Sequence, residues 1–282
     1  MEKYIDLHIH TTASDGTLTP RQAVTLAGRL DLAAIAVTDH DTTAGLLEAM
    51  VAGAELGVEV IPGIELAADY RGRSVHILGY FIDPGAAWLQ QALAWSVGRR
   101  DARNGQIVAA MKQDGFPISL EALQAEHPDA VLGRPHIAEW LMRHGYAASV
   151  EDAFRRWLNK GGPYYRPRER MTLRQAVQAI RGSGGLAGVA HPLQYGFPPA
   201  ELEAFLLAAR EAGCRALEAH YSKYGPDQQR DLCRTADRLG MALSGGSDFH
   251  GDRKPDIQMG SGIDGSLRVP YGVLERLRTL ER

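Results

Sequence analysis

Cysteine is scarce in this chain, and its scarcity limits the kinds of site that the protein can contain. The 282 residues include two cysteines, Cys214 and Cys233. Two cysteines cannot build a disulfide framework, and neither belongs to a Cys-x-x-Cys pair, so zinc sites made of thiolates are excluded. A metal site in this protein must therefore rely on imidazole and oxygen ligands.

Long apolar runs and a large net charge are also missing. The apolar stretch at 33–37 is far too short to span a bilayer, and the N-terminus lacks the basic and apolar regions of a signal peptide. The formal net charge of -3 gives no reason to expect a long nucleic acid as partner. We expect a cytoplasmic protein without membrane association, and we infer no obligate protein partner.

Short β-type runs alternate with helical patterns along most of the chain. This alternation favours a parallel sheet or a barrel, and therefore an α/β fold. The runs are rich in Ile, Val, Leu and Ala, as expected of strands buried on both faces; they lie at 4–10, 33–38, 59–66, 74–81, 185–191, 216–221 and 242–247. Helices are expected at 19–30, 42–57, 199–213 and 226–240. The third and fourth runs are separated only by 67–73, which predicts a hairpin.

The middle of the chain has a different pattern. It is mostly helical, with predicted helices at 86–114, 119–126, 134–145, 149–159 and 172–182. We predict a discontinuous barrel domain over 1–97 and 184–282, with a helical domain over 98–183 inserted into it and covering the active site. The insertion includes a basic and aromatic loop at 164–170. Its Tyr165, Arg166 and Arg168 could stack on a base or meet a phosphate, but a solvated loop is the simpler interpretation.

Histidines and carboxylates gather where the predicted strands end. His8 and His10 are two residues apart at the end of a strand, so both imidazoles can reach one point. The carboxyl ends of parallel strands are where barrel active sites are assembled. The complete set of such residues is His8, His10, Asp15, His40, Glu65, His76, His191, Asp248 and His250.

Each of these residues alone has an ordinary structural explanation. Asp15 lies in a Ser-Asp-Gly turn, where aspartate is common, and His191 before a proline could simply end a strand. Taken together, six histidines and three carboxylates buried without an ion would be costly. The set therefore predicts a metal site, and imidazole and carboxylate ligands suit Mn²⁺, Zn²⁺ or Fe²⁺.

The motifs in combination resemble those of the PHP (polymerase and histidinol phosphatase) family, a branch of the amidohydrolase superfamily. The resemblance rests on His8-Ile9-His10, Asp15, Thr38-Asp39-His40-Asp41, Pro62-Gly63-Ile64-Glu65, His76, His191-Pro192 and Ser247-Asp248-Phe249-His250. It implies a distorted (β/α)7 barrel that holds three divalent metal ions, with Mn²⁺ expected first and Zn²⁺ and Fe²⁺ as alternatives.

The resemblance also implies which residues hold each ion. The first ion would be held by His8, His10, Glu65 and Asp248. Glu65 would bridge to the second ion, which is completed by His76 and His191. The third would be held by Asp15, His40 and His250. Three divalent cations outweigh three carboxylates in charge, so such a site suits a phosphate ester.

A second string points to the substrate. Gly133-Arg134-Pro135-His136-Ile137-Ala138 is similar to the insertion of a PHP subfamily that removes the 3′-phosphate from nucleoside 3′,5′-bisphosphates such as pAp. The same group has a run like 220–224 after the sixth strand. The resemblance implies that Arg134, His136, Ser222 and Lys223 bind the second, non-reacting phosphate, since Arg and Lys suit phosphate groups.

The expected reaction is hydrolysis of the 3′-phosphate to give a nucleoside 5′-monophosphate and phosphate. Asp248 is expected to be essential, and His220, His136 or a metal-bound water could protonate the leaving oxygen. A 5′–3′ exonuclease acting on short RNA or DNA and a histidinol-phosphate phosphatase remain alternatives. A structural PHP domain of a DNA polymerase is disfavoured, because the chain has no room for a polymerase and its ligand set is complete.

Overall fold

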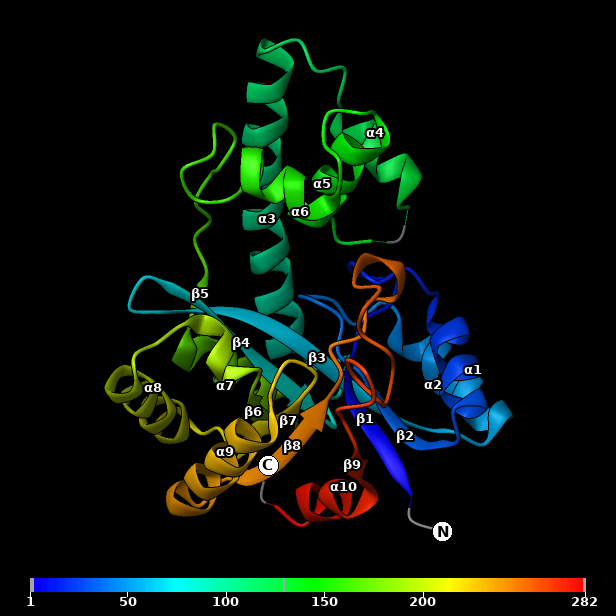
Figure 1. Cartoon of the computed structure of the whole chain (residues 1–282), viewed down its shortest axis with the longest axis vertical. Helices are drawn as coiled ribbons and strands as arrows, with labels where there is room; N and C mark the ends of the chain where they lie inside the picture. Colours follow the sequence, from blue (N-terminus) through cyan, green and yellow to red (C-terminus); the bar gives the residue numbers. More distant parts are fainter. Residues whose placement is uncertain (1–2, 129, 281–282) are drawn as a thin grey trace. The chain divides into compact units, whose positions relative to one another are not determined.

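The structure is a computed structural model that describes residues 3–128 and 130–280. It divides the chain into two compact units, one comprising 1–93 and 170–282 and the other 94–169 (Figure 1). The second unit ends earlier than the predicted insertion, 98–183, because α7 (Leu173–Gly182) belongs to the first unit. Its Ile180 lies against Gly79, a residue of β4 (Arg73–Tyr80). That the insertion is a separate domain covering the active site stays a prediction.

All seven predicted strands are present and form one sheet. Its order is β8-β7-β6-β4-β3-β2-β1-β9, and β5 pairs with β3 at one side. The main strands are β1 (Tyr4–Ile9), β2 (Leu32–Val37), β3 (Glu59–Tyr70), β4, β6 (Leu186–Val189), β7 (Ala216–Tyr221) and β8 (Ala242–Gly246). Two further strands, β5 (Met171–Thr172) and β9 (Val269–Pro270), have two residues each.

The predicted hairpin between the third and fourth strands is confirmed. β3 and β4 pair antiparallel, with Tyr70 opposite Arg73 at the turn. Arg71 and Gly72 both have positive φ, at 52° and 78°, which is the conformation of a type I′ turn. β4 is also antiparallel to β6, so this strand runs against its neighbours in an otherwise largely parallel sheet.

The last main strand returns to the first, which makes the sheet nearly closed and barrel-like. Beyond β8, Asp248 N donates to His8 O at 2.8 Å, and His10 N donates to Phe249 O at 2.9 Å. Gly246 allows this approach, because a Cβ there would lie 2.4 Å from both the backbone nitrogen and the Cβ of His8. The predicted α/β fold with a distorted barrel is therefore confirmed.

Helices of the first unit pack beside the strands that they connect. Figure 1 shows α1 and α2 near β2, α9 beside β7 and β8, and α8 next to α7. α1 begins after Thr19, whose side chain and that of Gln22 form a capping box. The bounds are α1 (Pro20–Arg29), α2 (Leu46–Leu56), α8 (Pro199–Ala212), α9 (Pro226–Leu239) and α10 (Tyr271–Arg278), with short 3-10 helices at Pro192–Tyr195 and Gly251–Arg253.

The second unit is helical and has its own core. α3 (Ala87–Gln113) leads into it, followed by α4 (Leu120–Glu126), α5 (Arg134–Arg143), α6 (Val150–Ala153) and a π-helical turn at Phe154–Leu158. Its buried core includes Ile107, Met111, Ile137, Trp140 and Leu141. Within the described residues, no helix combines the length and the apolar character that crossing a bilayer would require.

Candidate metal centre

The two histidines at the end of β1 converge as their spacing predicts. His8 and His10 are both fully buried, and their Nε2 atoms lie 3.2 Å apart. Two neutral imidazoles with facing nitrogens at this distance need a shared proton or a shared cation between or beside them. The strand thus directs two nitrogen ligands at one small volume.

Glu65, in β3, lies at the centre of the histidines. Its Oε1 is 2.9 Å from both His76 Nδ1 and His191 Nε2. Its Oε2 is 2.9 Å from His40 Nδ1 and faces the Nε2 atoms of the two β1 histidines. One buried carboxylate therefore contacts five imidazoles, an arrangement that suits a carboxylate bridging two cations.

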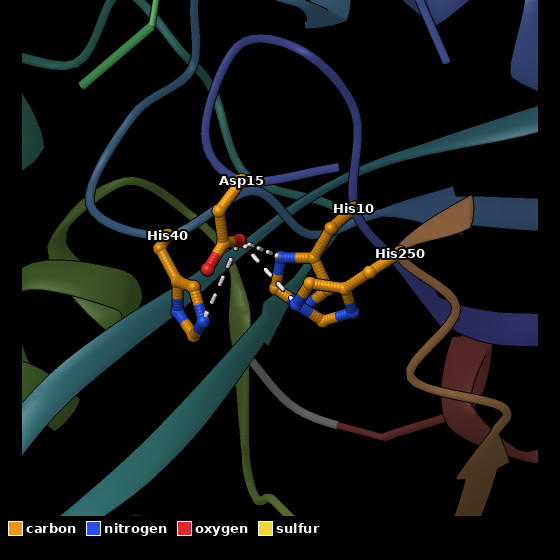
Figure 2. A group of neighbouring side chains, drawn as sticks. All are labelled: His10, Asp15, His40 and His250. Atoms are coloured by element: carbon orange, nitrogen blue, oxygen red, sulfur yellow. Dashed lines mark ion pairs between the residues drawn. The ribbon is translucent and has the colours of Figure 1, made fainter. Parts of the chain in front are cut away.

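Asp15 forms a second focus with three imidazoles. Figure 2 shows His10, His40 and His250 directed at one oxygen of Asp15. Asp15 Oδ1 lies 3.3 Å from His250 Nε2, 3.8 Å from His10 Nδ1 and 4.0 Å from His40 Nε2. These distances exceed those of direct hydrogen bonds, so the four groups surround a gap large enough for a cation.

The loop that presents Asp15 is held by the end of β2. Asp39 accepts hydrogen bonds from Thr11 N, Thr11 Oγ1 and Ser14 Oγ at 2.7, 2.7 and 2.5 Å. All three of these residues are buried. The loop after β1 is therefore anchored to the neighbouring strand, and Asp15 is held in place by its surroundings.

Asp248 joins the cluster from the far end of the sheet. Its Oδ1 lies 3.4 Å from His10 Nε2 and 3.6 Å from His8 Nε2. Its Oδ2 accepts hydrogen bonds from Tyr221 Oη at 2.8 Å and from Lys254 Nζ at 2.7 Å. One oxygen thus faces the imidazoles, while the other is held by two donors outside the cluster.

The structure brings all nine predicted ligands into one cluster. Four overlapping groups have ligand atoms close enough to share an ion: His10, Asp15, His40 and His250; His8, Glu65 and His191; His8, His10 and Asp248; and His40, Glu65 and His76. His8, His10, His40 and Glu65 each belong to two groups. The division of the nine residues among three ions therefore stays a prediction.

Burial and charge oppose each other at these groups. Burial alone raises the pKa of the Glu65 carboxyl, but the charges of His40, His76 and His8 outweigh it and hold that pKa well below its usual range. Burial lowers the pKa of His76 to about 4 and, helped by Lys254, that of His250 to about 4. These two imidazoles are neutral at pH 7, which is the form that binds metals.

The residues fit a group of cations, as their unsatisfied atoms show. His10 Nδ1, which faces Asp15, and Glu65 Oε2, which has only ion-pair contacts with imidazoles, are buried without a hydrogen-bond partner. Buried polar atoms are normally paired, and leaving them unpaired costs free energy. Imidazole and carboxylate donors together suit Mn²⁺, Zn²⁺ or Fe²⁺, so cations would satisfy atoms that the protein leaves unmatched.

The predicted substrate residues lie in both units. In the second unit, Arg134 donates to Leu158 O at 3.1 Å, and buried His136 accepts from Gly133 N through Nδ1 at 2.9 Å. In the first unit, Ser222 Oγ donates to Ser247 O at 2.7 Å, and Lys223 is exposed. The phosphate-binding roles of these residues stay predictions.

Three polar residues outside the predicted ligand set contact the cluster, and His220 lies on the same strand, β7, as two of them. His220 Nδ1 pairs with Gln229 Oε1 at 3.1 Å, which leaves its Nε2 available for proton exchange. Sequence reasoning missed Glu218, Tyr221 and Lys254, all of which contact predicted ligands. Only Glu218 left a signal, because it is a charged residue inside an otherwise apolar run.

Comparisons with known proteins agree with this geometry. The PHP domain family model matches residues 6–192. The chain is 33% identical over 87% of its length to the 3′,5′-nucleoside bisphosphate phosphatase of Chromobacterium violaceum, covering 87% of that protein. It is 33% identical over 95% of its length to the 5′-3′ exoribonuclease Rnm of Escherichia coli, covering 90% of that protein.

A solved structure gives the same result for the fold. A protein of Bifidobacterium adolescentis, assigned as a metal-dependent phosphoesterase, superposes with a TM-score of 0.86 at 32% identity. The match covers 98% of this chain and 95% of the other. With the cluster at the strand ends and the family model spanning most of the chain, this protein belongs to the PHP domain family.

Proposed function

We propose that this protein is a metal-dependent phosphoesterase that removes the 3′-phosphate from nucleoside 3′,5′-bisphosphates such as pAp. The products are a nucleoside 5′-monophosphate and phosphate. The observation that carries the proposal is the cluster of six imidazoles and three carboxylates at the strand ends. The proposed substrate class is supported by the similarity of this chain to the bisphosphate phosphatase of C. violaceum.

Three divalent cations would be held by the nine clustered residues, with Mn²⁺ as the first choice. His8, His10, Glu65 and Asp248 would hold one, Glu65, His76 and His191 the next, and Asp15, His40 and His250 the third. When bound, such ions lower the pKa of a coordinated water and neutralise charge on the phosphoryl and leaving oxygens.

The protein's own groups keep these ligands in position. Tyr221 and Lys254 hold the outer oxygen of Asp248, so its inner oxygen stays directed at the β1 imidazoles. Asp39 fixes the loop that presents Asp15. A site held this firmly does not need to rearrange when a phosphate ester arrives, which favours catalysis.

The non-reacting 5′-phosphate would be bound by Arg134, His136, Ser222 and Lys223. Arginine offers a bidentate fork and lysine a point charge, and both suit a phosphate dianion. Ser222 would have to exchange its present bond to Ser247 O for one to the phosphate. His220, through Nε2, and His136 are the candidates that could donate a proton to the leaving 3′-oxygen.

Exonuclease activity on short oligonucleotides is the second candidate function. The similarity to the exoribonuclease Rnm of E. coli supports it. Both reactions break a bond to a 3′-oxygen, so one centre could perform both. They differ in the substrate's length, because an oligonucleotide needs room for the nucleotides beyond the bond that is cleaved.

A comparison of substrates tests the proposal. The purified protein, loaded with Mn²⁺, is assayed for phosphate or nucleotide release from pAp, from 5′-phosphorylated oligonucleotides of a few residues, and from histidinol phosphate. We expect the highest kcat/KM on pAp. A higher kcat/KM on oligonucleotides would favour the exonuclease, and a preference for histidinol phosphate would overturn the nucleotide assignment.

A further inference from the structure

Glu218 is a fully buried carboxylate outside the predicted ligand set. It lies in β7, and its exposed fraction is 0%. Both of its oxygens are occupied: Oε1 pairs with His8 Nδ1 at 2.9 Å, and Oε2 accepts from His191 N at 2.6 Å. A buried carboxylate is costly unless it is hydrogen-bonded, and the two partners of Glu218 both belong to predicted metal ligands.

The contact with His8 determines which ring nitrogen holds the proton. A carboxylate only accepts hydrogen bonds, so His8 Nδ1 must carry a hydrogen. In the neutral imidazole, Nε2 then keeps its lone pair. That atom faces His10 Nε2 at 3.2 Å, Glu65 Oε2 at 3.5 Å and Asp248 Oδ1 at 3.6 Å. Glu218 therefore holds His8 in the tautomer that can bind an ion.

The contact with His191 acts on the backbone. His191 has φ 22° and ψ 58°, a left-handed conformation that a residue with a side chain rarely adopts. Its N–H donates to Glu218 while its Nε2 reaches Glu65 Oε1 at 2.9 Å. Strained backbone persists only where its surroundings hold it, and here the short bond to Glu218 does so.

We propose that Glu218 is a positioning residue for metal loading, which acts through His8 and His191 at once. Glu218 lies in β7, which is between β6 and β8 in the sheet. From there it connects His8, at the end of β1, with His191, in the loop after β6. Ligating histidines commonly donate their other ring nitrogen to a carboxylate, and loss of such a partner weakens metal binding. The inference rests on the proposed metal site but is independent of the substrate.

Glu218→Gln is the sharpest variant, because it keeps the shape of the side chain while removing its negative charge and its capacity to accept hydrogen bonds at both ends. The amide oxygen can serve one donor, and the NH₂ group then faces the other. Either His8 must move its proton to Nε2, where an ion would bind, or His191 N–H loses its acceptor. Glu218→Asp keeps the negative charge, but its shorter side chain moves the carboxylate away from both His8 and His191.

Glu59→Gln is the matched control. Glu59 is also a strand glutamate of the first unit, and it accepts from Tyr271 Oη at 2.8 Å and pairs with Arg278, away from the cluster. Mn²⁺ affinity of the metal-free full-length protein is measured by calorimetry, and folding by thermal melts followed by circular dichroism. The visible spectrum after Co²⁺ loading reports the ligand field directly.

We expect Glu218→Gln to bind Mn²⁺ about 10- to 100-fold more weakly, with an altered Co²⁺ spectrum, while Glu59→Gln matches the unaltered protein. Wild-type affinity and spectrum in a folded Glu218→Gln protein would overturn the inference. If that variant fails to fold, Glu218→Asp decides by the same criterion. The unaltered protein binding Mn²⁺ without hydrolysing pAp would refute the proposed function and leave this inference standing.

Discussion

Lys254 Nζ lies 2.7 Å from Asp248 Oδ2, the oxygen that also accepts from Tyr221. Burial alone raises the pKa of Asp248, but the charges of Lys254 and His250 outweigh it and hold that pKa well below its usual range. Asp248 is therefore ionised at neutral pH, with one oxygen held from outside and the other facing the β1 histidines.

Replacing Asp248 should remove activity and leave the protein folded. Asp248→Asn is preferred to alanine, because Asp248 has φ 59° and asparagine tolerates this conformation. We expect kcat/KM on pAp to fall by more than about 100-fold, since a ligand should matter more than its supporting partner. Near-normal activity would contradict the assignment, and the exposed Asp256→Asn serves as control.

Metal content should respond to single ligands. Asp15 contacts His250 and two other histidines at one focus, so Asp15→Ala should reduce bound Mn²⁺ from about three to about two per chain. Elemental analysis of the dialysed protein measures this. Asp227→Ala, at an exposed position in α9, should leave the content unchanged. An unchanged content in Asp15→Ala would show that this focus holds no ion.

Metal binding should release protons and strengthen as the pH rises. Burial lowers the pKa of His10, but the contacts of its imidazole with the carboxylates of Asp248 and Glu65 outweigh it and raise that pKa to about 9 in the metal-free protein. His10 is thus protonated at pH 7, and an ion must displace that proton.

The affinity for Mn²⁺ should increase up to about tenfold per pH unit for each proton released. The part of this increase that comes from His10 should level off above the pKa of His10. Calorimetry is carried out between pH 6 and pH 7.5, a range of roughly one and a half units that lies below the pKa of His10. Repeating it in two buffers of different ionisation enthalpy gives the number of protons released when Mn²⁺ binds. A pH-independent affinity with no proton release would contradict the expectation.

Gly246→Ala should open the seam between β8 and β1. The new Cβ would lie 2.4 Å from two atoms of His8, so the variant should lose about 1–3 kcal/mol of unfolding free energy and bind Mn²⁺ more weakly. Chemical denaturation and calorimetry measure both. Gly98→Ala is the control, because a Cβ there meets nothing within 4 Å in a helix and should be neutral or stabilising.

The strands and the ligands at their ends could be predicted from sequence because both depend on local patterns. Buried apolar runs mark the strands, and the spacing of His8 and His10 places both on one face. The turn between β3 and β4 could be read from Asp69-Tyr70-Arg71-Gly72, whose left-handed residues close the hairpin. α10 was missed because it is short, contains Gly272 and has no side-chain cap.

The supporting residues could not be predicted, because their roles depend on how strands and loops meet in space and not on a pattern along the sequence. Glu218 pairs with His8 across 210 positions of sequence, and no motif near either residue indicates this contact. Lys254 reaches Asp248 only through the path of the loop after β8. The sharing of His8, His10, His40 and Glu65 between groups is likewise a property of three-dimensional distance.

The seam between β1 and β8 has a consequence for the unfolded chain. Asp6 and Ser247, 241 positions apart, are hydrogen-bonded there, and His8 and Asp248 face each other beside them. An ion bound by that pair would tie the two ends of the chain together, as a long-range cross-link does. Since closing a long loop costs much chain entropy, such an ion would act as a reversible clasp that this cysteine-poor protein could gain or lose with the metal supply.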